Sequence, residues 1–157
     1  MKYSRQAAAV FLVLTVLWSC VIWSFSLDNA EQSAAESNRV SGFLSEIVEK
    51  VLGEQVELTQ HTVRKTAHFA EFAVLGTLLF MTVYLFGVKR VNKMYFIGLP
   101  ASTAVASIDE CLQLFSDGRS AQISDVLLDL TGAMFAFSVC VIIIRLTVRL
   151  RQGKNHE

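Results

Sequence analysis

The chain has 157 residues, of which 53% are hydrophobic and 18% charged, and its formal net charge is zero. A zero net charge argues against a nucleic-acid-binding protein, and so little charge would barely cover the surface of a soluble domain of this size. The mean hydropathy is clearly positive, and the length suits one domain, so we expect a single membrane domain over residues 1–157.

Four apolar segments are long enough to cross a bilayer, whose hydrocarbon core of about 30 Å needs roughly 20 residues of helix. They comprise residues 7–25, 66–88, 94–115 and 125–144. The first contains no charged residue, whereas each of the others contains ionisable side chains. The sequence therefore predicts an all-α, polytopic membrane protein with four transmembrane helices.

The first segment has an alternative interpretation as a cleaved signal peptide. Its apolar run is longer than the usual ~7–15 residues, and no clear small-x-small site follows it. Leu17 to Cys20 faintly resembles a lipoprotein cleavage site, but the apolar run continues past Cys20. Cys20, Cys111 and Cys140 match no zinc pattern, and we expect them to lie in the membrane without forming a disulfide framework.

Charged residues sort to two sides of the four predicted spans. Lys and Arg near the ends of membrane helices stay in the cytoplasm. They gather at both termini and between the second and third spans, as Lys2, Arg5, Lys89, Arg90, Lys93, Arg145, Arg149, Arg151 and Lys154. Apart from Glu157, the acidic residues fall on or near the other side. We therefore expect both termini in the cytoplasm.

The predicted outer loop, residues 26–64, begins with a polar stretch and then contains apolar residues at helical spacing. The apolar positions are Val40, Phe43, Leu44, Ile47, Val48, Val51 and Leu52. This pattern predicts a short amphipathic helix. The helix could simply cover the bundle, or it could lie in the interface as a lid over a substrate entrance.

Ionisable residues lie on one face of the second span, at its outer end. Arg64 and Lys65 lie four and three residues before His68, and Glu71 lies three residues after it, so they form one stripe descending over about two helical turns. At the outer end of the third span, a second polar group comprises Asp109, Glu110 and Gln113.

A tight turn and the fourth span complete this set. Gly118 suits a turn, which would direct Arg119 back toward the helices, and Asp125 and Asp129 lie one turn apart on the fourth span. Buried charges inside a membrane are unfavourable, so they usually face the bundle interior and carry function. The alternative is a polar network that holds the helices together.

The residue types suggest a division of roles. We expect the cations Arg64, Lys65 and Arg119 to hold a phosphate or carboxylate, with Gln113 and Asp129 completing the substrate-binding set. His68 could transfer protons near neutral pH. The candidate catalytic residues are His68, Glu71, Asp109, Glu110 and Asp125.

A divalent metal ion is a further interpretation of the same residues. His68 and Glu71 with Asp125 and Asp129 could ligate Mg²⁺ or Mn²⁺. The nearby cations Lys65 and Arg119 argue against this, so we do not favour a metal.

Three motifs resemble those of the VanZ-like family. Residues 64–76, RKTAHFAEFAVLG, resemble its first signature, and residues 109–119, DECLQLFSDGR, resemble its signature of an acidic pair, Gln and Gly-Arg. Residues 125–132, DVLLDLTG, are similar to its Asp-x-x-x-Asn/Asp-x-x-Gly segment. Two departures are that Asp129 stands where many members carry Asn, and that Ser116-Asp117 replaces a more usual apolar-Pro pair.

The resemblance implies a multi-pass protein of the bacterial plasma membrane with a cell-envelope role at its outer face. The family's namesake lowers susceptibility to teicoplanin without the peptide-precursor change that underlies vancomycin resistance, and the family implies no particular reaction. One hypothesis is a hydrolase or transferase acting on a phosphate-bearing, lipid-linked envelope molecule such as a cell-wall precursor. The others are a non-catalytic binder of membrane lipids or a lipoglycopeptide, and a small transporter or assembly partner.

Overall fold

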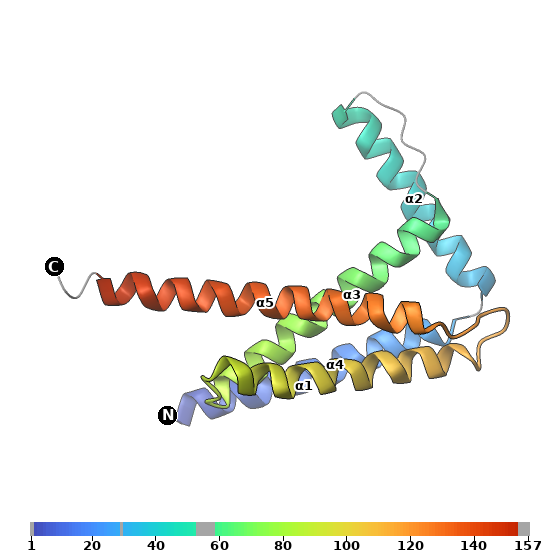
Figure 1. Cartoon of the computed structure of the whole chain (residues 1–157). Helices are drawn as coiled ribbons and strands as arrows, with labels where there is room; N and C mark the ends of the chain where they lie inside the picture. Colours follow the sequence, from blue (N-terminus) through green and yellow to red (C-terminus); the bar gives the residue numbers. More distant parts are fainter. Residues whose placement is uncertain (1, 29, 53–58, 154–157) are drawn as a thin grey trace.

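A computed structural model describes residues 2–28, 30–52 and 59–153 of the chain (Figure 1). Five helices and no strand occur in these residues, so the predicted all-α fold is confirmed. The helices are α1 (Lys2–Ser26), α2 (Ala30–Leu52), α3 (Gln60–Leu85), α4 (Val91–Gln113) and α5 (Ile123–Gly153).

Three of the helices are long and apolar enough to cross a membrane, not clearly the four that the sequence predicted. These segments are Arg5–Ser26, Gln60–Leu85 and Ile123–Gln152. The predicted third span is helical as α4, but Gly98, Pro100 and Ser102 lie in its middle and charged residues lie near both ends. This composition lowers the hydropathy of α4 below that of the other three.

The outer surfaces of α1 and α5 suit a lipid environment. Val13 and Leu17 of α1 are 57% and 56% exposed, and Phe135 of α5 is 61% exposed. Large apolar side chains gathered in this way on the surface of a soluble monomer would form an unfavourable patch. The surface composition therefore agrees with α1 and α5 being membrane helices.

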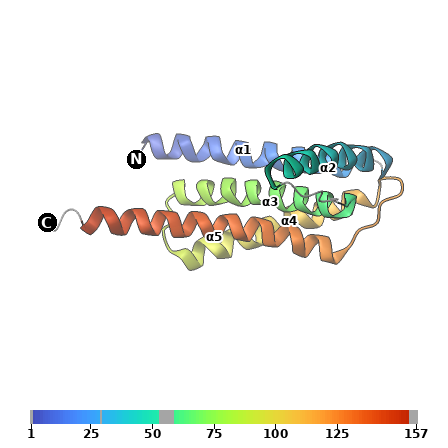
Figure 2. The same cartoon turned by 90° about the horizontal axis from the view of Figure 1, so that it is seen from above.

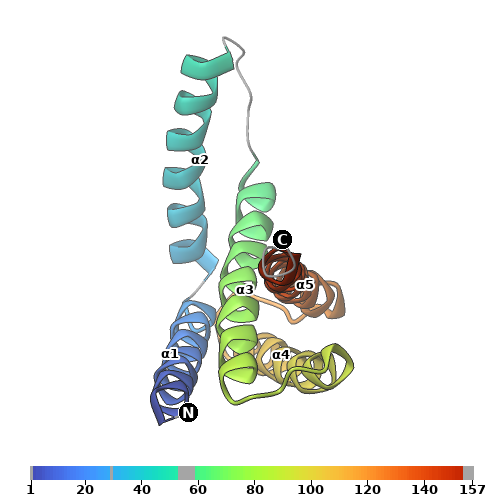
Figure 3. The ribbon, with the colours of Figure 1, turned by 90° about the vertical axis from the view of Figure 1, so that its left-hand side faces the viewer.

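Helix α3 packs against α1, α4 and α5 in one bundle and runs obliquely to them (Figure 1, Figure 2). Helix α1 begins and α5 ends at one end of this bundle, while the α1–α2 and α4–α5 connections lie at the other end. Helix α2 rises from the end of α1, contacts α3 and stands apart from α4 and α5 (Figure 3).

The contact between α3 and α5 is the most extensive in the fold, and two glycines make it close. A Cβ atom at Gly76 would lie 2.0 Å from the carbonyl oxygen of Ala133, and one at Gly132 would lie 2.4 Å from that of Phe69. Small residues of this kind let membrane helices approach backbone to backbone. The close approach at Phe69 brings the neighbouring His68 within reach of α5.

Helix α2 is longer than the short amphipathic helix predicted, because it includes the preceding polar stretch from Ala30 onward. Ala, Glu and Gln in that stretch are good helix formers. In the predicted apolar stripe, Val40 and Phe43 are 47% and 63% exposed. The side chains of Leu44, Ile47, Val48, Val51 and Leu52 lie outside the described residues.

The three cysteines are free, as predicted. Cys20 and Cys111 are exposed on the outside of their helices, and Cys140 is half-buried.

Candidate functional site

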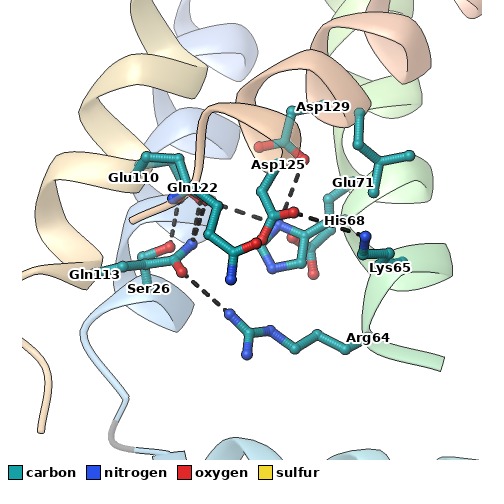
Figure 4. Close-up of polar contacts among 12 residues, drawn as sticks. Ser26, Arg64, Lys65, His68, Glu71, Glu110, Gln113, Gln122, Asp125 and Asp129 are labelled. Carbon is teal, nitrogen blue, oxygen red and sulfur yellow. Dashed lines mark hydrogen bonds and ion pairs between the residues drawn. The ribbon is translucent and has the colours of Figure 1, made fainter. Parts of the chain in front are cut away.

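The predicted polar residues gather at the end of the bundle where α1 and α4 end and α5 begins, beside the first turns of α3 (Figure 4). At the centre, His68 of α3 faces carboxylates from two other helices. Its Nδ1 atom lies 3.5 Å from Oδ1 of Asp129 and 4.0 Å from Oδ2 of Asp109. Both aspartates are 0% exposed.

The two buried aspartates differ in their hydrogen bonding. Asp109 accepts a bond of 2.5 Å from the Ser26 hydroxyl and one of 3.2 Å from Nε2 of Gln113. Among the described residues, neither carboxylate oxygen of Asp129 has a hydrogen-bond partner, and the same is true of His68 Nδ1. Asp109 is thus held by Ser26 and Gln113, whereas the nearest charged partner of Asp129 among the described residues is His68 Nδ1 at 3.5 Å.

Gln113 links this centre to Arg64 through its side-chain amide. Its Nε2 donates to Asp109 and, at 3.0 Å, to Glu110, while its Oε1 accepts a bond of 3.1 Å from Nη2 of Arg64. A carboxylate in this position could not donate and an ammonium could not accept. An amide therefore satisfies both sides, and Arg64 reaches the acidic pair only through Gln113.

Glu110 connects α4 to the start of α5. One carboxylate oxygen accepts from Gln113, and the other accepts a bond of 2.7 Å from the backbone N–H of Gln122. The two oxygens therefore join Glu110 to Gln113 in the last turn of α4 and to the backbone just before α5. The proposed catalytic role of Glu110 stays a prediction, and its contacts here are structural.

Arg119 follows the predicted turn, in which Gly118 has a φ of 76°, a value that favours glycine. Its Nη1 atom approaches the carbonyl oxygens of Phe25, Ser26 and Asp28 at 3.0, 3.4 and 3.3 Å. These carbonyls stand at the C-terminal end of α1, where a cation is favourable. Burial lowers the pKa of Arg119, but a guanidinium remains charged at neutral pH.

Lys65 and Asp125 form the outer edge of the site. The Lys65 ammonium lies 4.0 Å from Asp125, and 42% of the Lys65 side chain is exposed. An exposed pair of this kind contributes little to stability. Neither residue lines the cavity described next.

A cavity of about 450 Å³ lies beneath α2. Four predicted site residues line it, namely Arg64, His68, Glu71 and Arg119. The other walls come from the end of α1, from α3 and from the polar first half of α2, at Phe25, Ser26, Asp28, Ser33, Ser37, Val40, Thr62, Val63, Thr66, Ala67 and Ala70. The predicted set thus divides into these four residues of the cavity wall and a buried cluster around Asp109 and Asp129. His68 belongs to both.

Sequence reasoning missed several contributors from α1. Ser26 hydrogen-bonds Asp109, and its own carbonyl accepts a bond of 2.8 Å from the Ser116 hydroxyl. The indole of Trp18 donates a bond of 2.9 Å to the backbone carbonyl of Glu71. One feature of the sequence could have identified Ser26 as a site residue. It directly follows the first apolar run and therefore lies at the depth of the acidic residues.

The fold and the site define an all-helical integral membrane protein with a polar centre at one end of its bundle. The model of the VanZ/LLP1 family matches residues 11–145, most of the chain, and the chain belongs to this family. At the level of the family, membership indicates a membrane protein of the cell envelope linked to teicoplanin resistance. No curated protein and no solved structure matches the chain significantly.

Proposed function

We propose that this protein is a membrane-embedded enzyme that acts on an envelope lipid with an anionic headgroup. One observation carries the proposal: Arg64, His68, Glu71 and Arg119 line a single cavity at one end of the bundle. Cations and proton-transfer groups in one cavity are what hydrolysis or transfer at a phosphate would need.

The cavity suits an amphipathic ligand because its walls combine charge with apolar surface. Arg64 and Arg119 come from different elements and can contact an anion from two sides. Phe25, Val40 and Val63 line the same space. Apolar walls with a few placed polar groups are typical of small-molecule sites, and here they favour a phosphate-bearing prenyl or acyl lipid.

Glu71 is the group that we assign to proton transfer. It lies about two helical turns further along α3 than Arg64 and lines the same cavity as the two arginines. Its side chain is half-buried and makes no hydrogen bond within the described part of the chain, whereas its backbone carbonyl is held by Trp18. The carboxyl group is therefore available to a ligand.

The proposal includes a multi-pass topology in the bacterial plasma membrane, with α4 as a fourth span and both termini in the cytoplasm. The start of α1 and the end of α5 lie at the same end of the bundle, which suits an even number of crossings. The basic residues near that end suit the cytoplasmic side, and the cavity would then open at the outer face.

Comparison of membrane lipids tests the enzyme proposal. Lipids extracted from cells with the wild-type protein, with Glu71→Gln or without the protein are compared by mass spectrometry. Wild type should shift an anionic envelope lipid, and Glu71→Gln should resemble the strain without the protein. The control is Glu46→Gln, which changes an exposed glutamate of α2 that pairs with Lys50. The same shift in wild type and Glu71→Gln at equal expression would refute the proposal.

A second candidate is a non-catalytic binder of an envelope lipid or of an acyl-tailed lipoglycopeptide. The observation that favours it is that Arg64, Gln113, Glu110 and Arg119 all make contacts that hold the fold. Stoichiometric binding without product on long incubation, lost in Arg64→Gln and retained in Glu71→Gln, would support the binder over the enzyme.

A further inference from the structure

The least satisfied polar group described in the protein is the carboxylate of Asp129. It is 0% exposed, and neither oxygen has a hydrogen-bond partner among the described residues. Buried polar groups are nearly always hydrogen-bonded, and a buried charge without compensation is strongly unfavourable. The ion pair with His68, at 3.5 Å, is the one compensation that the described residues give this carboxylate, so the site needs a further partner for it.

Nearby cationic side chains do not supply that partner. Within the described residues, the ion pairs of Asp109 and Asp129 are made with His68 alone. Arg64 contacts Gln113, Arg119 contacts the end of α1, and Lys65 contacts Asp125. Glu110 and Glu71 add further negative charge around the cluster. One imidazole, even when protonated, offers a single charge against two buried aspartates.

The three side chains have the geometry of a metal site. One donor atom from each of His68, Asp109 and Asp129 lies within 4.8 Å of the other two, and the closest measured pair, His68 Nδ1 and Asp129 Oδ1, is 3.5 Å apart. A tetrahedral ion with bonds near 2.1 Å holds its ligand atoms about 3.4 Å apart. Small side-chain movements would therefore bring the three atoms onto one ion.

The surroundings of Asp109 are also those of a ligand. Ser26 donates to one of its oxygens and Gln113 to the other. Hydrogen bonds of this kind orient ligating carboxylates in metal sites. One lone pair on each oxygen remains for an ion.

We propose that His68, Asp109 and Asp129 bind a first-row divalent cation such as Zn²⁺ or Mn²⁺. Mixed imidazole and carboxylate ligands suit these ions. The three ligands come from α3, α4 and α5, so the ion would also join three helices. This ligand set differs from the one considered from sequence, because Glu71 lines the cavity and Asp125 pairs with Lys65.

The ion would deepen the proposed function without depending on it. His68 lines the cavity, so a metal on its Nδ1 side would lie next to a headgroup held by the arginines. Three protein ligands leave a coordination position for water or substrate, as in catalytic zinc sites. Metal binding can be measured whether or not a reaction occurs, so the two proposals can fail separately.

The test measures bound metal on the full-length protein in detergent. Protein is stripped with EDTA, incubated with Zn²⁺ or Mn²⁺, freed of excess ion and analysed by mass spectrometry. We expect wild type to retain about one ion per chain. Asp129→Asn should lose affinity by more than the roughly 10–100-fold caused by loss of an outer-shell partner. His61→Gln, which changes an exposed histidine of α3, is the control and should bind as wild type does.

Thermal unfolding shows whether the variant is folded. In EDTA, Asp129→Asn should be at least as stable as wild type, because the substitution removes one of two buried carboxylates that share a single imidazole. Added Zn²⁺ or Mn²⁺ should raise the melting temperature of wild type and not that of Asp129→Asn. Equal metal content in the two proteins, or no metal and no stabilisation in wild type, would overturn the metal site. Bound metal with unchanged membrane lipids would support the metal site and refute the enzyme proposal. A lipid change without bound metal would support the enzyme proposal and refute the metal site.

Discussion

Gly132 of α5 packs directly on the backbone of Phe69 in α3, so that a Cβ atom there would lie 2.4 Å from the Phe69 carbonyl oxygen. Phe69 is the neighbour of His68, and Gly132 lies three residues after Asp129. This contact therefore sets the distance between the imidazole and the buried carboxylate. Because the obstacle is backbone, a side chain could not be accommodated by a rotamer change.

Substitution of Gly132 by Ala should separate α3 from α5. We expect a loss of stability of about 1–3 kcal/mol, the usual range for overpacking, measured by thermal unfolding in detergent. Gly42→Ala is the matched control, because a Cβ atom at Gly42 meets nothing within 4 Å. It should be neutral or stabilising by roughly 0.5–1 kcal/mol. Equal melting temperatures for Gly132→Ala and wild type would contradict the close packing.

The Gln113 amide should be essential to the polar centre. Gln113→Leu leaves Arg64, Glu110 and Asp109 without the bonds that this amide makes. Buried groups left unsatisfied cost about 1–3 kcal/mol each, so we expect a clear fall in melting temperature. Gln122→Leu serves as the control, since Gln122 contacts Glu110 through its backbone N–H and its side chain makes an exposed hydrogen bond with Ser124. A variant Gln113→Leu as stable as Gln122→Leu would be inconsistent with the network.

Arg119 should stabilise the end of α1. Arg119→Ala removes a cation that contacts the carbonyls of Phe25, Ser26 and Asp28. Interactions at a helix C-terminus contribute up to about 2 kcal/mol in partly buried geometries. Faster amide hydrogen exchange in the last turn of α1 should report the loss. Arg39→Ala, at an exposed position on α2, should leave that exchange unchanged; similar effects of both variants would argue against a specific contact.

The position of α4 can be tested by labelling single cysteines in a background where Cys20, Cys111 and Cys140 are replaced by Ser. Lys89 precedes α4 and Ser120 follows it, and both are exposed. If α4 crosses the membrane, an impermeant thiol reagent should label Ser120→Cys in intact cells and Lys89→Cys only after the cells are opened. Labelling of both positions from the outside would exclude the crossing.

Much of the fold follows from the sequence because membrane helices are specified locally. Long apolar runs must form helices in a bilayer, where every backbone polar group needs a partner within its own segment. The four apolar runs accordingly coincide closely with α1, α3, α4 and α5. Helix α4 is less apolar than the other three because it carries polar side chains, among them Ser102, Asp109 and Gln113, that are buried between helices.

The sequence by itself also placed ionisable residues at one end of the bundle, because spacing along each helix decides the face and the depth of a side chain. Spacing cannot decide which helix faces which, and this the tertiary structure determined. Contact of α3 with α5 at Gly76 and Gly132 directs His68 to Asp129, whereas Glu71 faces the cavity. Arg119 contacts the end of α1, and Ser26 joins Asp109, because the turn after α4 packs against α1. These pairings depend on contacts between segments far apart in the chain, so only the packed bundle separates a cavity wall from a buried cluster.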